Sequence, residues 1–108
     1  MILMRFSVFS AMLSKVPIKE VIKLVSQVGF DAIEWGVGYP NLSEEQAFKE
    51  AETIRKTGHD AGLVVSCVSG GPKFDELEKI KKNIDIAHRM ECSQFRMIVP
   101  WYEFNEEE

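Results

Sequence analysis

Three segments of this chain share one pattern, in which an amphipathic stretch ends at a short turn and a largely apolar run begins at once. The turns are Gly29-Phe30-Asp31, Gly62 and Glu91-Cys92-Ser93-Gln94, and the runs behind them are Ala32–Trp35, Leu63–Val68 and Phe95–Val99. Runs that are apolar on both faces are typical of parallel strands covered by helices. The pattern therefore predicts repeated helix–turn–strand units of a parallel α/β fold.

The amino-terminal part of the chain predicts one more strand and the first helix. Met4–Ser10 is apolar without alternation, which favours a buried first strand over a secretory leader. Pro17 suits the first turn of a helix, and Gly29 supplies the left-handed residue that ends it. The apolar stripe expected to face inward is Ile18, Val21, Ile22, Val25 and Val28.

Two further helices are predicted. Ser43-Glu44-Glu45-Gln46 has the form of a capping box, and the helix behind it either frays at Gly58 or continues to Gly62. A third helix is expected from Asp75 to Met90. The side chains expected to face inward are Ala47, Phe48, Ala51, Ile54 and Ala61 in the second helix, and Leu77, Ile80, Ile84 and Ala87 in the third.

The count of elements predicts four parallel strands joined by three helices, with a repeat of about 30 residues. A closed barrel of eight such units takes about 250 residues. Residues 1–108 therefore predict a single partial domain, the parallel (βα)3β half of a TIM barrel. A flatter, flavodoxin-like sheet stays open as an alternative.

Composition excludes several classes of partner. The net charge of −4 argues against nucleic acid, because phosphate binding requires clustered Lys and Arg. No apolar run reaches the roughly 20 residues that a membrane span requires. Cys67 and Cys92 have no metal or redox spacing, which predicts two reduced structural thiols and a cytoplasmic protein.

The segment Asp31-Ala32-Ile33-Glu34-Trp35, directly after Gly29-Phe30, resembles the second-strand signature of the xylose isomerase-like TIM barrel family. Further segments resemble the amino-terminal half of that family in their order along the chain. They are Phe6–Ser10, the helix at Pro17, Gly62-Leu63 and Ala87–Met97. The family includes sugar phosphate isomerases and epimerases and relatives of endonuclease IV.

The resemblance implies sugar isomerase or epimerase chemistry supported by a divalent metal, either manganese, magnesium or zinc. In the family the metal ligands lie mostly on strands five to eight, which this sequence lacks, so no cofactor and no activity are expected for this chain alone. The endonuclease IV branch takes histidines from the ends of strands three and four. In this sequence the corresponding positions are Ser66-Cys67-Val68 and Ile98-Val99-Pro100. They contain no histidine, which disfavours a function in DNA repair.

Glu34 is the first candidate for a binding site. By alternation it points into the barrel at the carboxyl end of its strand, where it binds a sugar hydroxyl or supports a general base, or is a structural carboxylate held by backbone donors or an arginine. Trp35, Tyr39 and Trp101 are candidates to stack on a small sugar ligand, as is Tyr102, although aromatic residues at strand ends also close cores and subunit interfaces. No catalytic residue is assigned.

The remaining candidates have simple structural explanations. His59 and His88 are expected on the solvent faces of helices. Ser69-Gly70-Gly71 is either an anion-binding nest or an ordinary turn between strand and helix. Cys67 lacks a partner histidine that would make it a nucleophile.

Open strand edges predict association, either as a homo-oligomer or with a complementary carboxyl-terminal half. Three interpretations of the chain stay open. It is one half of an enzyme, an oligomeric binding module, or a truncated non-catalytic fragment.

Overall fold

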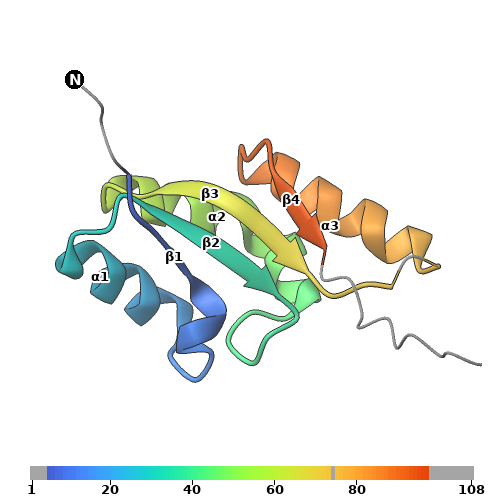
Figure 1. Cartoon of the computed structure of the whole chain (residues 1–108), viewed down its shortest axis with the longest axis horizontal. Coiled ribbons are helices and arrows are strands. Elements are labelled where there is room, and N and C mark those ends of the chain that lie inside the picture. The colour runs from blue at the N-terminus through green and yellow to red at the C-terminus, as the bar shows by residue number, and fades with distance from the viewer. Residues whose placement is uncertain (1–4, 74, 98–108) are drawn as a thin grey trace, which may run out of the picture.

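The computed structural model describes residues 5–73 and 75–97, which form four strands and three α-helices around one core (Figure 1). In chain order the elements are β1 (Ser7–Phe9), a 3-10 helix η1 (Ser10–Leu13), α1 (Ile18–Val28), β2 (Ala32–Val37), α2 (Glu44–Asp60), β3 (Val64–Gly70), α3 (Leu77–Arg89) and β4 (Phe95–Met97). All strand pairs are parallel, in the order β1-β2-β3-β4. The predicted α/β fold with a parallel sheet is confirmed.

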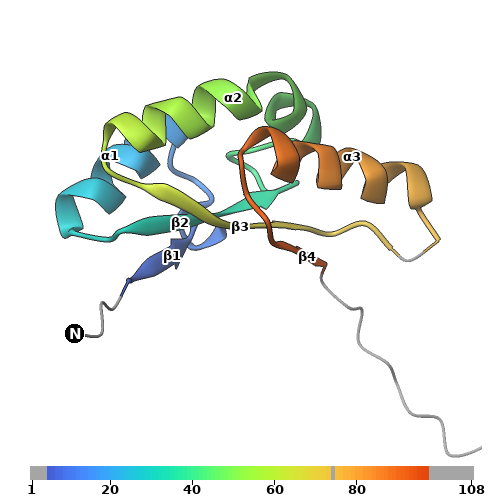
Figure 2. The ribbon, with the colours of Figure 1, turned by 90° about the horizontal axis from the view of Figure 1, so that it is seen from above.

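The three helices cover one face of the sheet and leave the other face free of helices (Figure 2). A flavodoxin-like sheet has helices on both faces and a reversal in its strand order. The sequential order and the single helical layer instead match half of a TIM barrel. The core lies between the helices and the covered face, and its largest fully buried side chains are Trp35, Ile33, Leu42, Ile86 and Met90.

Two strands extend further than the sequence predicted. β2 continues to Val37 and β3 continues to Gly70, because Gly36 and Val37 still pair with Ser69 and Gly70. The buried hydroxyl of Ser10 accepts a hydrogen bond from the Gly36 amide at 2.8 Å, which ties the unpredicted η1 to β2. The predicted strand ends at residues 4 and 98–99 lie outside the described residues.

The predicted helix boundaries agree with the structure where capping residues set them. Gly29 has φ of 102° at the end of α1, as its left-handed role requires. The Ser43 hydroxyl accepts a hydrogen bond from the backbone N–H of Gln46 at 3.1 Å, which caps α2. The helix then passes through the buried Gly58 without fraying, and the Gly58 carbonyl accepts a hydrogen bond from the Leu63 amide that opens β3.

Three residues predicted to face inward are exposed instead, namely Val28 (73%), Leu77 (63%) and Ile84 (50%). Val28 lies about 70° from the centre of the buried stripe of α1, which is formed by Val21, Ile22 and Val25, at 100° per residue. The buried side of α3 is formed by Asn83, Ile86 and Ala87, about a third of a turn from Leu77 and Ile84. Helix α3 therefore carries a second, exposed apolar stripe.

Apart from Val64 at the start of β3, the large exposed apolar side chains of the described residues gather at the two ends of the strand order. Phe6, Met12, Leu24 and Val28 belong to the first strand–helix unit, and Leu77 and Ile84 belong to the last helix. Soluble proteins normally cover or pair such edges. Within residues 5–73 and 75–97, no helix has both the length and the apolar character needed to cross a membrane.

Candidate functional site

The face of the sheet without helices, which we call the open face, brings together side chains from all four strands. Strand register places Phe9 beside Glu34, Glu34 beside Cys67, and Ser69 beside Arg96. The Ser7 and Ser66 hydroxyls also meet on this face, at 2.6 Å. In a closed barrel this face would line the interior.

An ion pair between Glu34 and Arg96 dominates the open face. The Arg96 guanidinium crosses β3 and donates to Glu34 Oε2 from Nε at 3.2 Å and, more closely, from a terminal nitrogen. The Glu34 side chain is 20% exposed and that of Arg96 is 55% exposed. The hydrogen bond to Glu34 raises the pKa of Arg96, so the cation persists at every physiological pH.

The structure changes the predicted position of Glu34 along its strand. Because β2 reaches Val37, Glu34 is the third of six residues and lies in the middle of the strand instead of at its carboxyl end. Its partner Arg96 was not among the sequence-based candidates. A single basic residue inside the apolar run of β4 was the available signal, because it matches the single acidic residue inside β2.

Aromatic rings flank the ion pair. The Phe9 ring lies 5.3 Å from the Arg96 guanidinium carbon and packs edge to face with Tyr39 at 5.6 Å. Both rings lie against Gly36, where an added Cβ would come within 2.9 Å of them. Tyr39 is half-buried in the turn after β2, which the Gly38 amide closes by donating to the Leu42 carbonyl at 2.8 Å.

Trp35, the second aromatic candidate, lies on the covered face with 1% exposure and packs into the core. The structure therefore does not bring it together with Glu34 and Tyr39. Trp101 and Tyr102 lie outside the described residues.

Cys67 lies beside Glu34 on the open face. Burial raises its pKa first, and the negative charge of Glu34 raises it further. The thiol is therefore protonated near neutral pH, which makes it a poor nucleophile. Both cysteines are free, as predicted.

The other sequence-based candidates do not join this site. His59 and His88 are exposed on α2 and α3, as predicted. Ser69 and Gly70 are the last two residues of β3 and pair with neighbouring strands. They are extended strand instead of the nest or turn that the sequence suggested.

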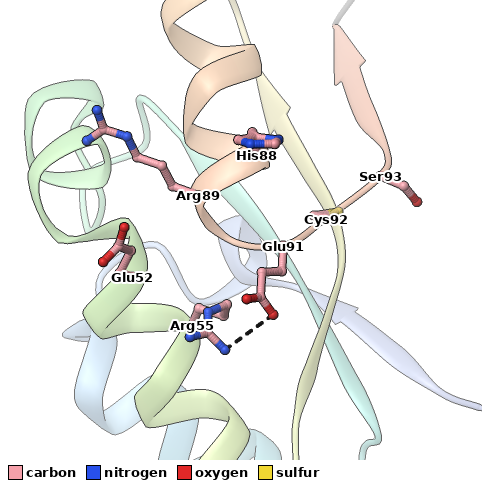
Figure 3. Close-up of a pocket in the computed structure, with 7 residues that line it drawn as sticks. All are labelled: Glu52, Arg55, His88, Arg89, Glu91, Cys92 and Ser93. Atoms are coloured by element: carbon pink, nitrogen blue, oxygen red, sulfur yellow. Dashed lines mark ion pairs between the residues drawn. The ribbon is translucent and has the colours of Figure 1, made fainter.

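A hollow of about 780 Å³ lies at the amino-terminal ends of the strands, next to the turn that joins α3 to β4 (Figure 3). Two of its charged side chains, Arg55 and Glu91, form an ion pair with each other. Arg55 points toward Glu91 at 3.5 Å, while Arg89 turns away to Asp85 and the Phe48 carbonyl. Because active sites of TIM barrels lie at the carboxyl ends of the strands, this edge is not the candidate site.

Comparison with known proteins identifies the class of fold. No protein-family model and no curated protein matches the sequence. The chain is similar to the crystal structure of the probable 3-DHS dehydratase AsbF involved in petrobactin synthesis from Bacillus anthracis, with a TM-score of 0.70 and 15% identity. The match covers 88% of this chain and 38% of the AsbF chain.

This chain thus has the fold of a TIM-barrel half with a parallel four-stranded sheet, and it spans well under half the length of the structure it matches. At 15% identity the similarity concerns the fold alone.

The divalent metal that the sequence resemblance implies does not fit the described residues. Among residues 5–73 and 75–97, no group of three or more His, Cys, Asp or Glu side chains lies close enough to hold an ion. The Glu34 carboxylate is engaged by Arg96, which opposes binding of a second cation there.

Proposed function

We propose that this chain forms the substrate-binding amino-terminal half of a xylose isomerase-like sugar phosphate isomerase or epimerase. The observation that supports the proposal is the Glu34–Arg96 pair on the open face, which a closed barrel would enclose. A planar guanidinium binds a carboxylate or phosphate through two parallel hydrogen bonds, and a carboxylate accepts hydrogen bonds from sugar hydroxyls. A substrate that carries both an anionic group and hydroxyls would replace the ion pair, with its anionic group bound to Arg96 and a hydroxyl bound to Glu34.

In this proposal Arg96 holds the anionic group and Glu34 the neighbouring hydroxyl, while Phe9 and Tyr39 supply apolar surface beneath the sugar. Phe9 already keeps the guanidinium in place, which reduces the ordering cost of binding. Cys67 remains a protonated neighbour without a role in proton transfer.

The half by itself is expected to be inactive. Electrostatic stabilisation of a transition state requires a site that excludes water, and Arg96 is more than half exposed here. A divalent manganese, magnesium or zinc ion would be supplied only in a completed barrel. The two free cysteines agree with a cytoplasmic location.

A binding titration and an activity assay test the proposal together. Fructose 6-phosphate added to ¹⁵N-labelled protein should shift the backbone amides of Glu34 and Arg96 in a saturable way. With manganese or magnesium present, the same mixture should give no isomerised product. Turnover by the chain alone would refute the expected inactivity.

Arg96→Gln tests the residue that carries the proposal, and Arg89→Gln is the matched control because Arg89 lies on α3 away from the open face. Binding should weaken at least about tenfold in the first variant and stay unchanged in the second. Equal binding by Arg96→Gln and the original chain would reject the assignment.

The second candidate function is that of an assembly module, in which two copies close one barrel. It is favoured by the exposed Phe6, Leu24 and Val28 at one end of the strand order and Leu77 and Ile84 at the other. Two copies related by a two-fold axis would cover both ends at once.

Light scattering tests this candidate. It should return about twice the chain mass of 12.3 kDa, and Ile84→Glu should shift the mass toward the monomer. Glu78→Lys, a charge reversal on the polar side of α3 away from the Leu77 and Ile84 stripe, is the control. A monomeric mass at high protein concentration would reject self-association. The exposed edges would then be expected to bind a complementary carboxyl-terminal half.

A further inference from the structure

The aromatic rings beside the Glu34–Arg96 pair come from two separate segments of the chain. Phe9 is the last residue of β1, and Tyr39 belongs to the turn after β2. Their rings pack edge to face at 5.6 Å, and the Phe9 ring lies 5.3 Å from the Arg96 guanidinium carbon. The position of both rings therefore depends on what holds the turn after β2 against the segment that follows β1.

The segment that follows β1 is η1, which lies beside the turn after β2 and is attached at both of its ends (Figure 1). At its first residue, the Ser10 hydroxyl accepts a hydrogen bond from the Gly36 N–H at 2.8 Å. At its other end, the side-chain nitrogen of Asn41 donates to the carbonyls of Leu13 and Val16, both at 3.1 Å. Asn41 thus joins the turn after β2 to the connection between η1 and α1.

The Asn41 amide has one favourable orientation at this position. Both groups in front of its nitrogen are carbonyl oxygens, so the reverse orientation would place the amide oxygen against two acceptors. In the observed orientation the amide oxygen is buried and has no hydrogen-bond partner among the described residues. Because such a buried acceptor costs free energy, the favourable contribution of Asn41 lies in its two donors.

The turn that carries Tyr39 is closed by its own backbone. The Leu42 N–H donates to the Tyr39 carbonyl at 2.9 Å, and the Gly38 N–H donates to the Leu42 carbonyl at 2.8 Å. Asn41 lies inside this closed turn, two residues after Tyr39. The attachment of Asn41 to η1 therefore sets the position of the whole turn, and with it the position of the Tyr39 ring.

We propose that Asn41 is a positioning residue for the ligand site of the open face. By holding the turn after β2 against η1, it keeps the Tyr39 ring on Phe9, and Phe9 keeps the Arg96 guanidinium in place. Asn41 does not contact the ligand and acts by reducing the ordering cost of binding. The proposal rests on the proposed function for its ligand, whereas the ring geometry is measurable in the chain alone.

Nuclear magnetic resonance of the ligand-free chain is the first test. Asn41→Asp keeps the size and the turn preference of the side chain but replaces both donors with an oxygen that repels the two carbonyls. The Phe9 and Tyr39 ring protons should lose most of the ring-current shifts that each ring induces in the other, and the Arg96 Nε–H signal should move. Unchanged ring signals would overturn the proposal.

Ser26→Ala is the matched control. The Ser26 hydroxyl donates to the Ala61 carbonyl at 2.8 Å, so it also joins two distant segments, but at the amino-terminal ends of the strands. Both variants should unfold at a lower urea concentration than the original chain, and only Asn41→Asp should change the ring signals. Equal changes of the ring signals in the two variants would mean that Asn41 acts only through overall stability.

Ligand binding is the second test. The dissociation constant for fructose 6-phosphate should rise about fivefold in Asn41→Asp and in Asn41→Ala, and stay unchanged in Ser26→Ala. The neutral alanine variant excludes repulsion of the phosphate by the added carboxylate. Unchanged affinity in Asn41→Ala would reject the role in binding. If the original chain binds no fructose 6-phosphate, the proposed function fails, and the ligand-free ring signals still decide whether Asn41 positions the rings.

Discussion

The two faces of the sheet differ in how they are completed. The covered face is closed by the chain's own helices, and Ile33, Trp35 and Val37 are at most 3% exposed there. The open face carries an ion pair, a thiol and two aromatic rings that remain partly in water. Stability therefore resides on one face of the strands, while the groups able to bind a ligand lie on the other.

The largest effect expected from this comparison is on the covered face. Trp35→Ala should lower the free energy of unfolding by about 3–5 kcal/mol, because it leaves a large cavity in the core. Phe9→Ala, on the open face, should cost less than half as much, since its ring is only half-buried. Urea unfolding followed by circular dichroism measures both. Equal losses would mean that the open face is also a packed core.

Glycines on the two faces give the second test. Gly70→Ala should destabilise the protein by about 1–3 kcal/mol, because the new Cβ would lie 2.5 Å from the buried Asn83 amide. Gly36→Ala meets the Tyr39 and Phe9 rings at 2.8–2.9 Å, but these rings lie at the open face and have room to move. Thermal unfolding should rank Gly70→Ala as the less stable variant, and the reverse order would contradict the difference between the faces.

The fold was largely predictable from sequence because its signals are local. Gly29 and the Ser43 cap fix helix ends within one turn of chain, and apolar runs mark strands. The Leu77 and Ile84 stripe was misassigned to the core because periodicity reveals that a helix has an apolar face without revealing what covers it.

The candidate site was only partly predictable. Glu34 stands out as an acid in an apolar strand, but its partner Arg96 is 62 residues away in the sequence and meets it across β3. Asn41 gave no specific signal, because asparagine is common in turns whether or not its side chain reaches another segment. Such pairings depend on tertiary register, which no local pattern records.

The ion pair of the open face gives a smaller expected effect. Arg96→Gln should change the free energy of unfolding by less than about 1 kcal/mol, because Arg96 is 55% exposed and solvent screens the pair. The difference from the original chain should shrink further in high salt. Urea unfolding at low and high ionic strength measures it. A loss near that of Trp35→Ala would show that the pair supports the fold rather than binding.

The smallest expected effect concerns the Cys67 thiol. The charge of Glu34 contributes to its raised pKa, so Glu34→Gln should lower the pKa and speed alkylation by iodoacetamide at a fixed, mildly alkaline pH. The rest of the increase in pKa, which comes from burial and to a smaller degree from Cys92, should persist in the variant. In the Cys67→Ser variant only Cys92 can be alkylated, so this variant gives the alkylation rate of Cys92, which serves as the internal reference. An unchanged Cys67 rate would mean that the carboxylate does not act on the thiol, and that water screens charges on the open face more strongly than its geometry implies.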